Sequence, residues 1–356
     1  SSAASDVYKR QNKLILPLLY AKICTKGVRI MSNEKNHGAL KYMAIVAGAF
    51  ATTFYISGEI AYHFMLSRRG LNGPIATAVQ DKERKSIQEN EYRANLERIL
   101  HEGSDWFETF PKEKLEIENR NGDILHADLI KPEKESNIYV LCIHGYTSAP
   151  KFMGIYAKKF RELGYNVVLP SLRGHADSEE EFISMGWKDR LDVVDWINYI
   201  VKEHPDCEII LHGVSMGAAT TMMTLGEELP SNVKAAIEDC GYTNAWDVIK
   251  HKMSKMKIPD FPFLYSANSI NRMRENFSLK EASCTEQLKK CITPLLFIHG
   301  EADDFVPYSM LDIVYDAADK CEKEKLSVPD APHARSVCAH PDLYWNTIIN
   351  FLKKYI

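Results

Sequence analysis

Over the carboxyl-terminal two thirds of the chain, the pattern of apolar and polar residues predicts strands that alternate with helices. Alternating residues over 114–118 and 124–130, joined at Asn121-Gly122, predict an antiparallel hairpin. Short apolar runs predict further strands at 138–143, 166–170, 207–212 and 234–239. Amphipathic stretches predict helices at 151–163, 188–203 and 216–229. This succession is typical of an α/β fold whose mainly parallel sheet is covered on both faces by helices.

This alternation is interrupted between Tyr242 and Cys291, where about fifty residues separate two predicted core strands. Large apolar residues recur in this insert, and four of them are candidates for lining a substrate pocket: Trp246, Phe261, Phe263 and Tyr265. We expect residues 242–291 to form a helical cap over the site. Ordinary core packing of the same apolar residues is the alternative.

A second apolar region, Leu40 to Gly58, has a charge-free core of about 17 residues, near the lower limit for a bilayer-spanning helix. It can extend to Leu66, with Arg68 and Arg69 at an interface and Tyr42 and Tyr62 in the headgroup belts. We expect residues 31–69 to hold a tail and a single-pass membrane anchor. An interfacial helix and a helix packed on the domain are the alternatives. The distribution of basic residues favours a cytoplasmic enzyme.

The remaining segments divide the chain further. Ser1 to Gln11 match one reading frame of a common transposase-based sequencing adapter, so we expect residues 1–30 to be non-native and Met31 to be the natural start. A genuine amino-terminal extension is the alternative. Residues 70–110 predict a connecting helical segment whose Trp106, Phe107 and Phe110 contact the domain. Residues 111–356 then form the catalytic domain.

Composition narrows the function classes. The 356 residues are 45% hydrophobic and 26% charged, with a formal net charge of −4, which is ordinary for an enzyme with one substantial core. We see no basic face that would indicate a nucleic-acid partner. The eight cysteines are scattered and have no zinc-type spacing, so they do not indicate a metal site. The serine chemistry considered below needs neither a metal nor an organic cofactor, and we expect none.

Gly213-Val214-Ser215-Met216-Gly217 carries the strongest chemical signal. It fits the G-x-S-x-G nucleophile elbow and lies between a predicted strand and a predicted helix, as that motif requires. The two glycines leave room for a sharp turn that exposes the serine hydroxyl. Ser215 is therefore the candidate nucleophile.

The chain order expected after an elbow serine is an acid and then a histidine. A predicted strand at 294–300 runs into a loop with Asp303 and Asp304, either of which could orient a histidine. His333 follows a short strand and lies in a loop, whereas His340 precedes Pro341 at the start of a helix. We favour His333 as the general base that takes the Ser215 proton.

The loop after strand 138–143 reads His144-Gly145-Tyr146, and a glycine there lets backbone N–H groups point into the site. The amides of Tyr146 and Met216 are the candidates for an oxyanion hole, each worth about 2.7–4 kcal/mol. We expect His144 to brace the loop rather than to take part in catalysis.

Together these segments resemble the α/β-hydrolase superfamily, and more narrowly the bacterial serine hydrolases grouped with serine aminopeptidases, acyl esterases and fermentation–respiration-switch-like proteins. The matching pieces span about 240 residues in the family's order: 144–147, 172–178, 213–217, 299–307 and 332–334. In the family pattern the acid comes three residues after the His-Gly pair, which selects Asp303 over Asp304. Ala176 and Pro332 depart from the pattern, and Pro332 leaves the loop before His333 less defined.

The resemblance implies a serine hydrolase that acts through an acyl-enzyme. An apolar cap and a membrane helix point to lipid-like esters or thioesters. An aminopeptidase-like peptidase or amidase is the alternative, and a catalytically inactive, membrane-tethered scaffold is the alternative of another class. A dehalogenase is disfavoured because that chemistry needs a carboxylate where Ser215 stands.

Overall fold

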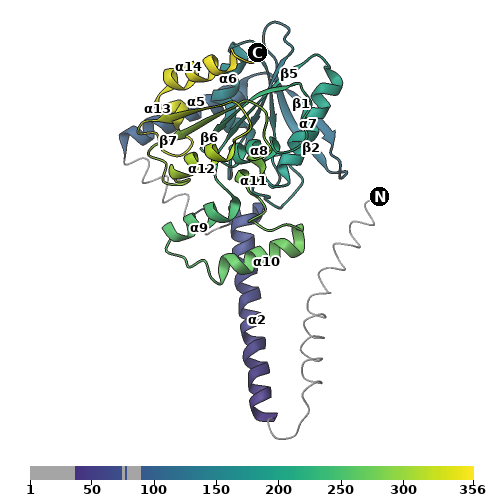
Figure 1. The fold of residues 1–356 in the computed structure, drawn as a ribbon, viewed down its shortest axis with the longest axis vertical. Helices are drawn as coiled ribbons and strands as arrows, with labels where there is room; N and C mark the ends of the chain where they lie inside the picture. Colours follow the sequence, from purple (N-terminus) through teal and green to yellow (C-terminus); the bar gives the residue numbers. More distant parts are fainter. Residues whose placement is uncertain (1–36, 74–76, 78–89) are drawn as a thin grey trace. The chain divides into compact units, whose positions relative to one another are not determined.

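The structure is a computed structural model that describes residues 37–73, 77 and 90–356. The chain divides into two compact units, Ser1–Ser57 and Gly58–Ile356, and the second is called the larger unit below. Residues 1–30, which we expect to be non-native, lie outside the described residues. Figure 1 shows the fold coloured along the sequence.

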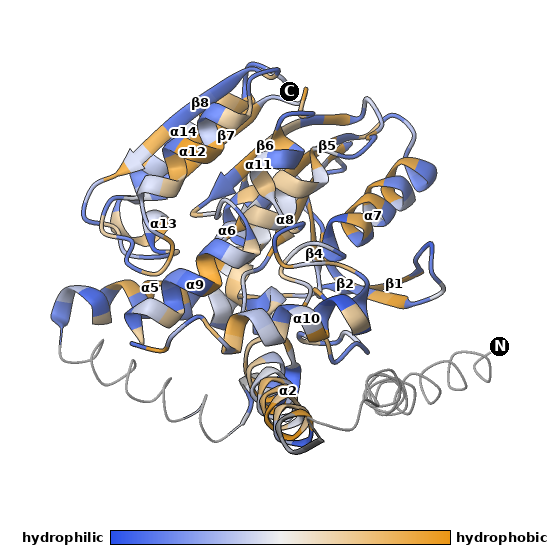
Figure 2. Ribbon diagram, turned by 60° about the horizontal axis from the view of Figure 1, so that its bottom comes forward, coloured by the Kyte–Doolittle hydropathy of each residue, from blue (hydrophilic) through white to orange (hydrophobic). Residues whose placement is uncertain are grey.

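The first described element is a long apolar helix, α2 (His37–Leu66). Its stretch Leu40–Leu66 is long and apolar enough to cross a membrane and is mostly exposed. Tyr42, Ile45 and Phe50 are among its exposed large side chains, and the helix is largely coloured as hydrophobic in Figure 2. A membrane anchor remains a prediction that rests on length and composition.

The last two turns of α2 belong to the larger unit. Tyr62 and Leu66 are buried in its main hydrophobic core. The Tyr62 and Phe182 rings stack with their centroids 6.1 Å apart. Just beyond α2, Arg68 begins the short helix α3 (Arg68–Leu71) and donates hydrogen bonds to the carbonyls of Gly174 and His175. Arg68 therefore contacts the larger unit, which begins at Gly58.

The larger unit is built on an eight-stranded sheet with the order β1-β2-β4-β3-β5-β6-β7-β8. The first two pairings, β1 with β2 and β2 with β4, are antiparallel, and the other five are parallel. The strands are β1 (Glu113–Glu118), β2 (Ile124–Ile130), β3 (Ile138–Ile143), β4 (Asn166–Pro170), β5 (Glu208–Val214), β6 (Val233–Asp239), β7 (Leu295–Gly300) and β8 (Lys323–Val328). The predicted hairpin and mainly parallel sheet are confirmed.

Helices cover both faces of the sheet (Figure 1). On one face lie α7 (Asp189–Glu203), α8 (Met216–Thr224), α11 (Cys284–Leu288) and α12 (Ser309–Ala317). On the other lie α5 (Glu91–Thr109), the 3-10 turn η1 (Pro150–Met153), α6 (Gly154–Glu162), α13 (Ser336–Ala339) and α14 (Pro341–Leu352). Alternate residues of β3 enter the two cores, Leu141 one and Val140 the other, because successive strand side chains point to opposite faces.

Helix α8 is shorter than the sequence predicts, and helix α5 lies within the predicted connecting segment. Helix α8 ends at Thr224 and not at residue 229, and just beyond its end Gly226 packs against Gln287, where a Cβ would lie 2.2 Å from the side-chain oxygen. Helix α5 starts after Asn90, whose side chain accepts a hydrogen bond from the Arg93 N–H, and continues to Thr109. It thus places Phe107 in the core, as expected for this connecting segment.

The insert at 242–291 forms α9 (Ala245–Lys255), α10 (Phe263–Glu275) and α11. Cys284 and Leu288 of α11 are buried in the main core, and this helix packs on α8. Helices α9 and α10 extend beyond the covered sheet, beside the end of α2 (Figure 2). The term cap is used below for α9, α10 and the loop between them.

Candidate active site

Ser215 lies on a sharp turn between β5 and α8. Its backbone angles, φ 58° and ψ −117°, are rare for a residue with a side chain, and its N–H donates a 2.8 Å hydrogen bond to the Asp239 carbonyl. A Cβ at Gly213 would lie 2.2 Å from the Gly217 oxygen, and one at Gly217 would lie 2.0 Å from the Ile143 oxygen. The turn therefore needs glycine at both positions of the motif.

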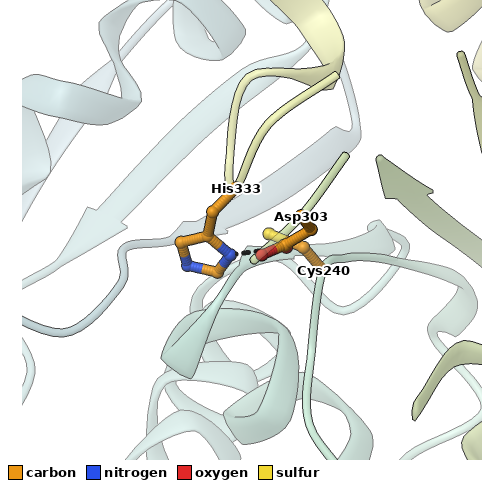
Figure 3. A group of neighbouring side chains, drawn as sticks. All are labelled: Cys240, Asp303 and His333. Atoms are coloured by element: carbon orange, nitrogen blue, oxygen red, sulfur yellow. Dashed lines mark hydrogen bonds and ion pairs between the residues drawn. The ribbon is translucent and has the colours of Figure 1, made fainter. Parts of the chain in front are cut away.

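Ser215, His333 and Asp303 form one chain of hydrogen bonds. Ser215 Oγ lies 2.9 Å from His333 Nε2. His333 Nδ1 lies 2.7 Å from Asp303 Oδ2, the contact drawn as a dashed line in Figure 3. Because a carboxylate only accepts, Nδ1 of His333 carries the proton and Nε2 is free to accept from the serine hydroxyl. The structure thus brings together the three residues chosen from the sequence.

The Asp303 carboxylate is held on every side. Its Oδ1 accepts from the N–H groups of Phe305 and Val306, both at 2.9 Å, and its Oδ2 lies 3.3 Å from His299 Nε2 as well as near His333. Burial alone would raise the pKa of Asp303, but the hydrogen bonds from the two histidines outweigh burial and hold that pKa well below its usual range. Asp303 is therefore ionised at neutral pH.

The residues not chosen lie elsewhere. Asp304 is exposed, and none of the hydrogen bonds that fix Asp303 involves its carboxylate. His340 is the residue before α14, which starts at Pro341. The predicted helix entry there is confirmed, and His340 has no contact with Ser215 among the described residues.

The loop after β3 lies against the nucleophile. A Cβ on Gly145 would approach Ser215 Cβ to 3.2 Å, so the chain passes close to the serine. Met216 is the first residue of α8, and the N–H of such a residue has no intrahelical partner. The Tyr146 phenol donates a 2.8 Å hydrogen bond to the Met65 carbonyl, which fixes the loop to the end of α2. The assignment of the Tyr146 and Met216 amides to an oxyanion hole remains a prediction.

Two neutral histidines support this loop. His144 Nε2 accepts from the Leu172 N–H, and His175 Nε2 accepts from the Thr147 N–H, both at 3.2 Å. Burial, with a contribution from His175, lowers the pKa of His144 to about 3, so it is uncharged at neutral pH. These contacts agree with the bracing role expected for His144.

Buried titratable groups that the sequence analysis did not assign lie beneath the site. Glu238 and Asp239 end strand β6, and both are fully buried. Burial raises the pKa of Glu238 to about 8 and that of Asp239 to about 6. Burial alone would lower the pKa of His299, but the hydrogen bond and charge of Asp303 outweigh it and raise that pKa. The signal in the sequence that could have pointed to Glu238 and Asp239 is their position as two acidic residues at the end of the mostly apolar strand β6.

Cys240 lies beside Asp303 and His333 (Figure 3). One ligand-type atom from each of Cys240, Asp303 and His333 falls within 4.8 Å of the others, a spacing that could hold a metal ion. Metal ligation needs a thiolate, whereas burial and the nearby carboxylates raise the pKa of the Cys240 thiol well above its usual range. Asp303 and His333 are also already engaged with each other, so the arrangement favours proton transfer over metal binding.

The four cap residues chosen from the sequence do not share one environment. Trp246 is nearly buried and packs edge-to-face on Tyr265, with ring centroids 5.0 Å apart. Phe263 is partly buried against the main core, while Phe261 and Tyr265 are exposed. A groove beside His333 is lined from the cap by Lys252 and Lys255, and by none of the four. Their role in substrate binding remains a prediction.

The fold and the arrangement of this site are those of the α/β-hydrolase fold family. A family model described as alpha/beta hydrolase fold matches residues 138–257. The chain is 25% identical over 262 residues to the uncharacterized protein YqkD of Bacillus subtilis (strain 168), covering 72% of this chain and 85% of YqkD. It is 23% identical over 233 residues to the thermostable monoacylglycerol lipase of Bacillus sp. (strain H-257), and the match covers 61% of this chain and 90% of the lipase.

A solved structure shows the same fold. The Pyrococcus furiosus esterase Pf2001 superposes with a TM-score of 0.56 at 23% sequence identity, over 69% of this chain and 93% of the esterase. The expected α/β-hydrolase fold is therefore confirmed.

Proposed function

We propose that this protein is a serine hydrolase that cleaves carboxylic esters or thioesters through an acyl-enzyme. The observation that carries the proposal is the hydrogen-bonded chain from Ser215 through His333 to the ionised Asp303. The strained backbone at Ser215 supports it, because such strain is concentrated at functional positions.

In the proposed reaction, Ser215 Oγ attacks the substrate carbonyl carbon while its proton passes to His333 Nε2. Asp303 accepts from His333 Nδ1 and stabilises the imidazolium that forms. The negative charge on the carbonyl oxygen is held by the Tyr146 and Met216 amides. His333 then gives its proton to the leaving alcohol or thiol, and a water molecule, activated by the same histidine, releases the acid from Ser215.

An apolar, lipid-like acyl group is the proposed substrate class. The monoacylglycerol lipase and esterase relatives support an ester. A mostly exposed apolar helix at the amino-terminal side supports a site close to amphipathic molecules. We propose that this helix anchors the enzyme in a membrane, with the catalytic domain on the cytoplasmic side, where the flanking basic residues favour it.

The test combines active-site labelling with a substrate panel. We expect a fluorophosphonate probe to label the full chain at Ser215, and Ser215→Ala to abolish labelling and lower turnover of p-nitrophenyl esters at least about 10³-fold. Ser269→Ala, an exposed serine on α10, is the matched control and should label and turn over normally.

Two results would overturn the proposal in different ways. A folded chain that neither labels nor hydrolyses any ester would be a binding scaffold on a hydrolase fold. A chain that labels but prefers aminoacyl amides over p-nitrophenyl esters would be an aminopeptidase-like enzyme.

A further inference from the structure

A groove with a cavity volume of about 350 Å³ runs past the catalytic histidine. It lies between α5 and the cap helix α9, which are neighbours in Figure 2. Arg93 and Glu97 of α5 line one side, and Lys252 and Lys255 of α9 line the other. Its volume is within the range of small-ligand pockets, about 300–1,000 Å³.

The groove is positively charged although the chain as a whole is acidic. Four cationic side chains and two carboxylates line it, and the formal net charge of the chain is −4. Arg335 and Glu97 form an ion pair at 2.7 Å and so neutralise each other. The other charged side chains that line the groove are the cations Arg93, Lys252 and Lys255 and the carboxylate of Asp304.

The cations lie next to the reacting groups. Lys252 Nζ stands 4.1 Å from the centroid of the Phe305 ring, and that ring stacks on the imidazole of His333 at 4.7 Å. Across the described part of the chain, neither the Arg93 guanidinium nor the Lys255 ammonium has a hydrogen bond or an ion pair. Two positive groups are therefore available to a ligand in the groove.

The position beside His333 indicates which part of a substrate would enter. The leaving-group oxygen must receive its proton from His333 Nε2, so the alcohol portion of an ester lies on the histidine side of Ser215. The Gly145–Tyr146 loop approaches Ser215 separately and is not part of the groove lining. A charge carried by the alcohol portion would thus meet the basic groove.

We infer that the groove binds an anionic group, a phosphate or a carboxylate, carried by the alcohol portion of the ester substrate. This inference rests on the proposed hydrolase function and narrows its substrate class. Arg93 and Lys255 contact the anion, and Lys252 adds to the local positive potential. Favourable charge pairs at a partly exposed site contribute modestly, roughly two- to fivefold in affinity for each pair.

Three short-chain esters that share one acyl group test the inference: hexanoyl glycerol, hexanoyl glycerol 3-phosphate and hexanoyl glycerate. They are to be compared on the full chain in detergent below the concentrations at which they aggregate. We expect kcat/KM for both anionic esters to exceed that for the neutral ester by about tenfold at low salt, and to fall toward it in 0.5 M NaCl. A preference for the phosphate alone would assign the site to phosphate.

Charge-removing variants locate the effect. Arg93→Gln and Lys255→Gln should each lower the anionic-to-neutral ratio of kcat/KM by about two- to fivefold, and the double variant by more. Arg98→Gln on α5 and Lys257→Gln after α9 are matched controls that do not line the groove, and should keep the wild-type ratio.

A wild-type ratio near one, or a ratio that Arg93→Gln and Lys255→Gln leave unchanged, would overturn the inference. In either case, labelling of Ser215 by fluorophosphonate together with hydrolysis of the neutral ester would leave the hydrolase proposal standing. Failure of both labelling and hydrolysis would instead overturn the proposed function itself.

Discussion

The Oδ2 atom of Asp303 lies 3.3 Å from the Nε2 atom of His299, a fully buried histidine at the end of β7. The same oxygen accepts a hydrogen bond from Nδ1 of His333 at 2.7 Å. The Asp303 carboxylate thus contacts two histidines: His333, the proposed general base, and His299, which is enclosed by the core. His299 acts through Asp303 and is a positioning residue.

Replacing His299 should impair turnover more than binding. His299→Leu removes one donor to Asp303 Oδ2 and leaves the carboxylate less firmly oriented, so we expect kcat for a p-nitrophenyl ester to fall about tenfold with little change in KM. His299→Gln keeps an N–H donor and should recover part of the loss. If both variants lose stability but keep wild-type kcat when folded, His299 is structural only.

The two neighbouring aspartates should respond very differently. Asp303 is ionised and orients His333, so Asp303→Asn should lower kcat by about 10³–10⁴-fold. Asp304 is exposed, and Asp304→Asn should change turnover of a neutral ester less than about fivefold. Steady-state kinetics on both purified variants make the comparison. The reverse order would make Asp304 the catalytic acid.

Buried Glu238 should make folding stability depend on pH. Its pKa is raised by burial from 4.5 to about 8, so between these values the folded state holds a proton that the unfolded state has lost. Raising the pH through this window therefore favours the unfolded state. Glu238→Gln mimics the protonated form, and its Tm should fall less than that of the wild type between pH 5 and pH 8.

The exposed Glu228→Gln is the control for this measurement and should follow the wild-type curve. Thermal unfolding followed by circular dichroism at a series of pH values would show the difference. Parallel curves for Glu238→Gln and the wild type would mean that Glu238 is already ionised in the folded state.

Truncation should separate the helix from the enzyme at Gly58. A chain that starts at Gly58 keeps Tyr62, Leu66 and Arg68 on the larger unit, so we expect it to stay soluble without detergent and to hydrolyse esters. A chain that starts at Gly70 loses these contacts and should unfold at a clearly lower temperature. The sequence motifs alone, which all follow Lys114, would predict that a chain lacking residues 31–69 is soluble and active. The contacts of residues 58–69 lead us to expect a loss of stability as well.

Point variants test the same boundary. Leu66→Ala should cost about 2–5 kcal/mol because Leu66 is fully buried, whereas Ile60→Ala, on the exposed face of the same helix, should cost little. Equal Tm values for the chains starting at Gly58 and Gly70 would show that the end of α2 does not stabilise the enzyme.

The cap should govern the choice of acyl chain and not the chemistry. Burial contributes about 0.8 kcal/mol per CH₂, so a pocket that includes Trp246 or Phe263 should favour longer esters until it is full. Trp246→Ala and Phe263→Ala should shift the chain-length optimum, measured as kcat/KM over acetyl to dodecanoyl esters, and spare acetyl esters. An unchanged profile on folded protein would mean that both residues serve packing alone.

Much of the fold and the triad could be predicted because each signal is local. The central strands β3, β4, β5 and β7 are short, mostly apolar runs, and Ser215 lies in a motif whose flanking strand and helix are visible in the sequence. Asp303 needed a family pattern as well, because two adjacent aspartates follow β7 and only the folded loop directs one of them toward His333.

The rest depends on contacts between distant segments. An apolar helix serves a lipid environment and a protein core equally well, so the pattern of residues 40–66 could not show that Tyr62 and Leu66 are enclosed by the larger unit. The charge states of Glu238 and His299 depend on burial and on each other. The basic groove brings α5 and α9 together across more than 150 residues of chain.

The hydrogen bond from the Tyr146 phenol to the Met65 carbonyl bears on how this protein could be re-engineered. An anchor joined to its enzyme by a linker can be exchanged for any other anchor. Here the final turns of the helix hold the loop that carries a candidate oxyanion amide, so a chimera with a foreign helix must retain residues 58–69 as its junction. The end of the helix and the loop after β3 therefore form one structural unit, and substitutions in one are constrained by the other.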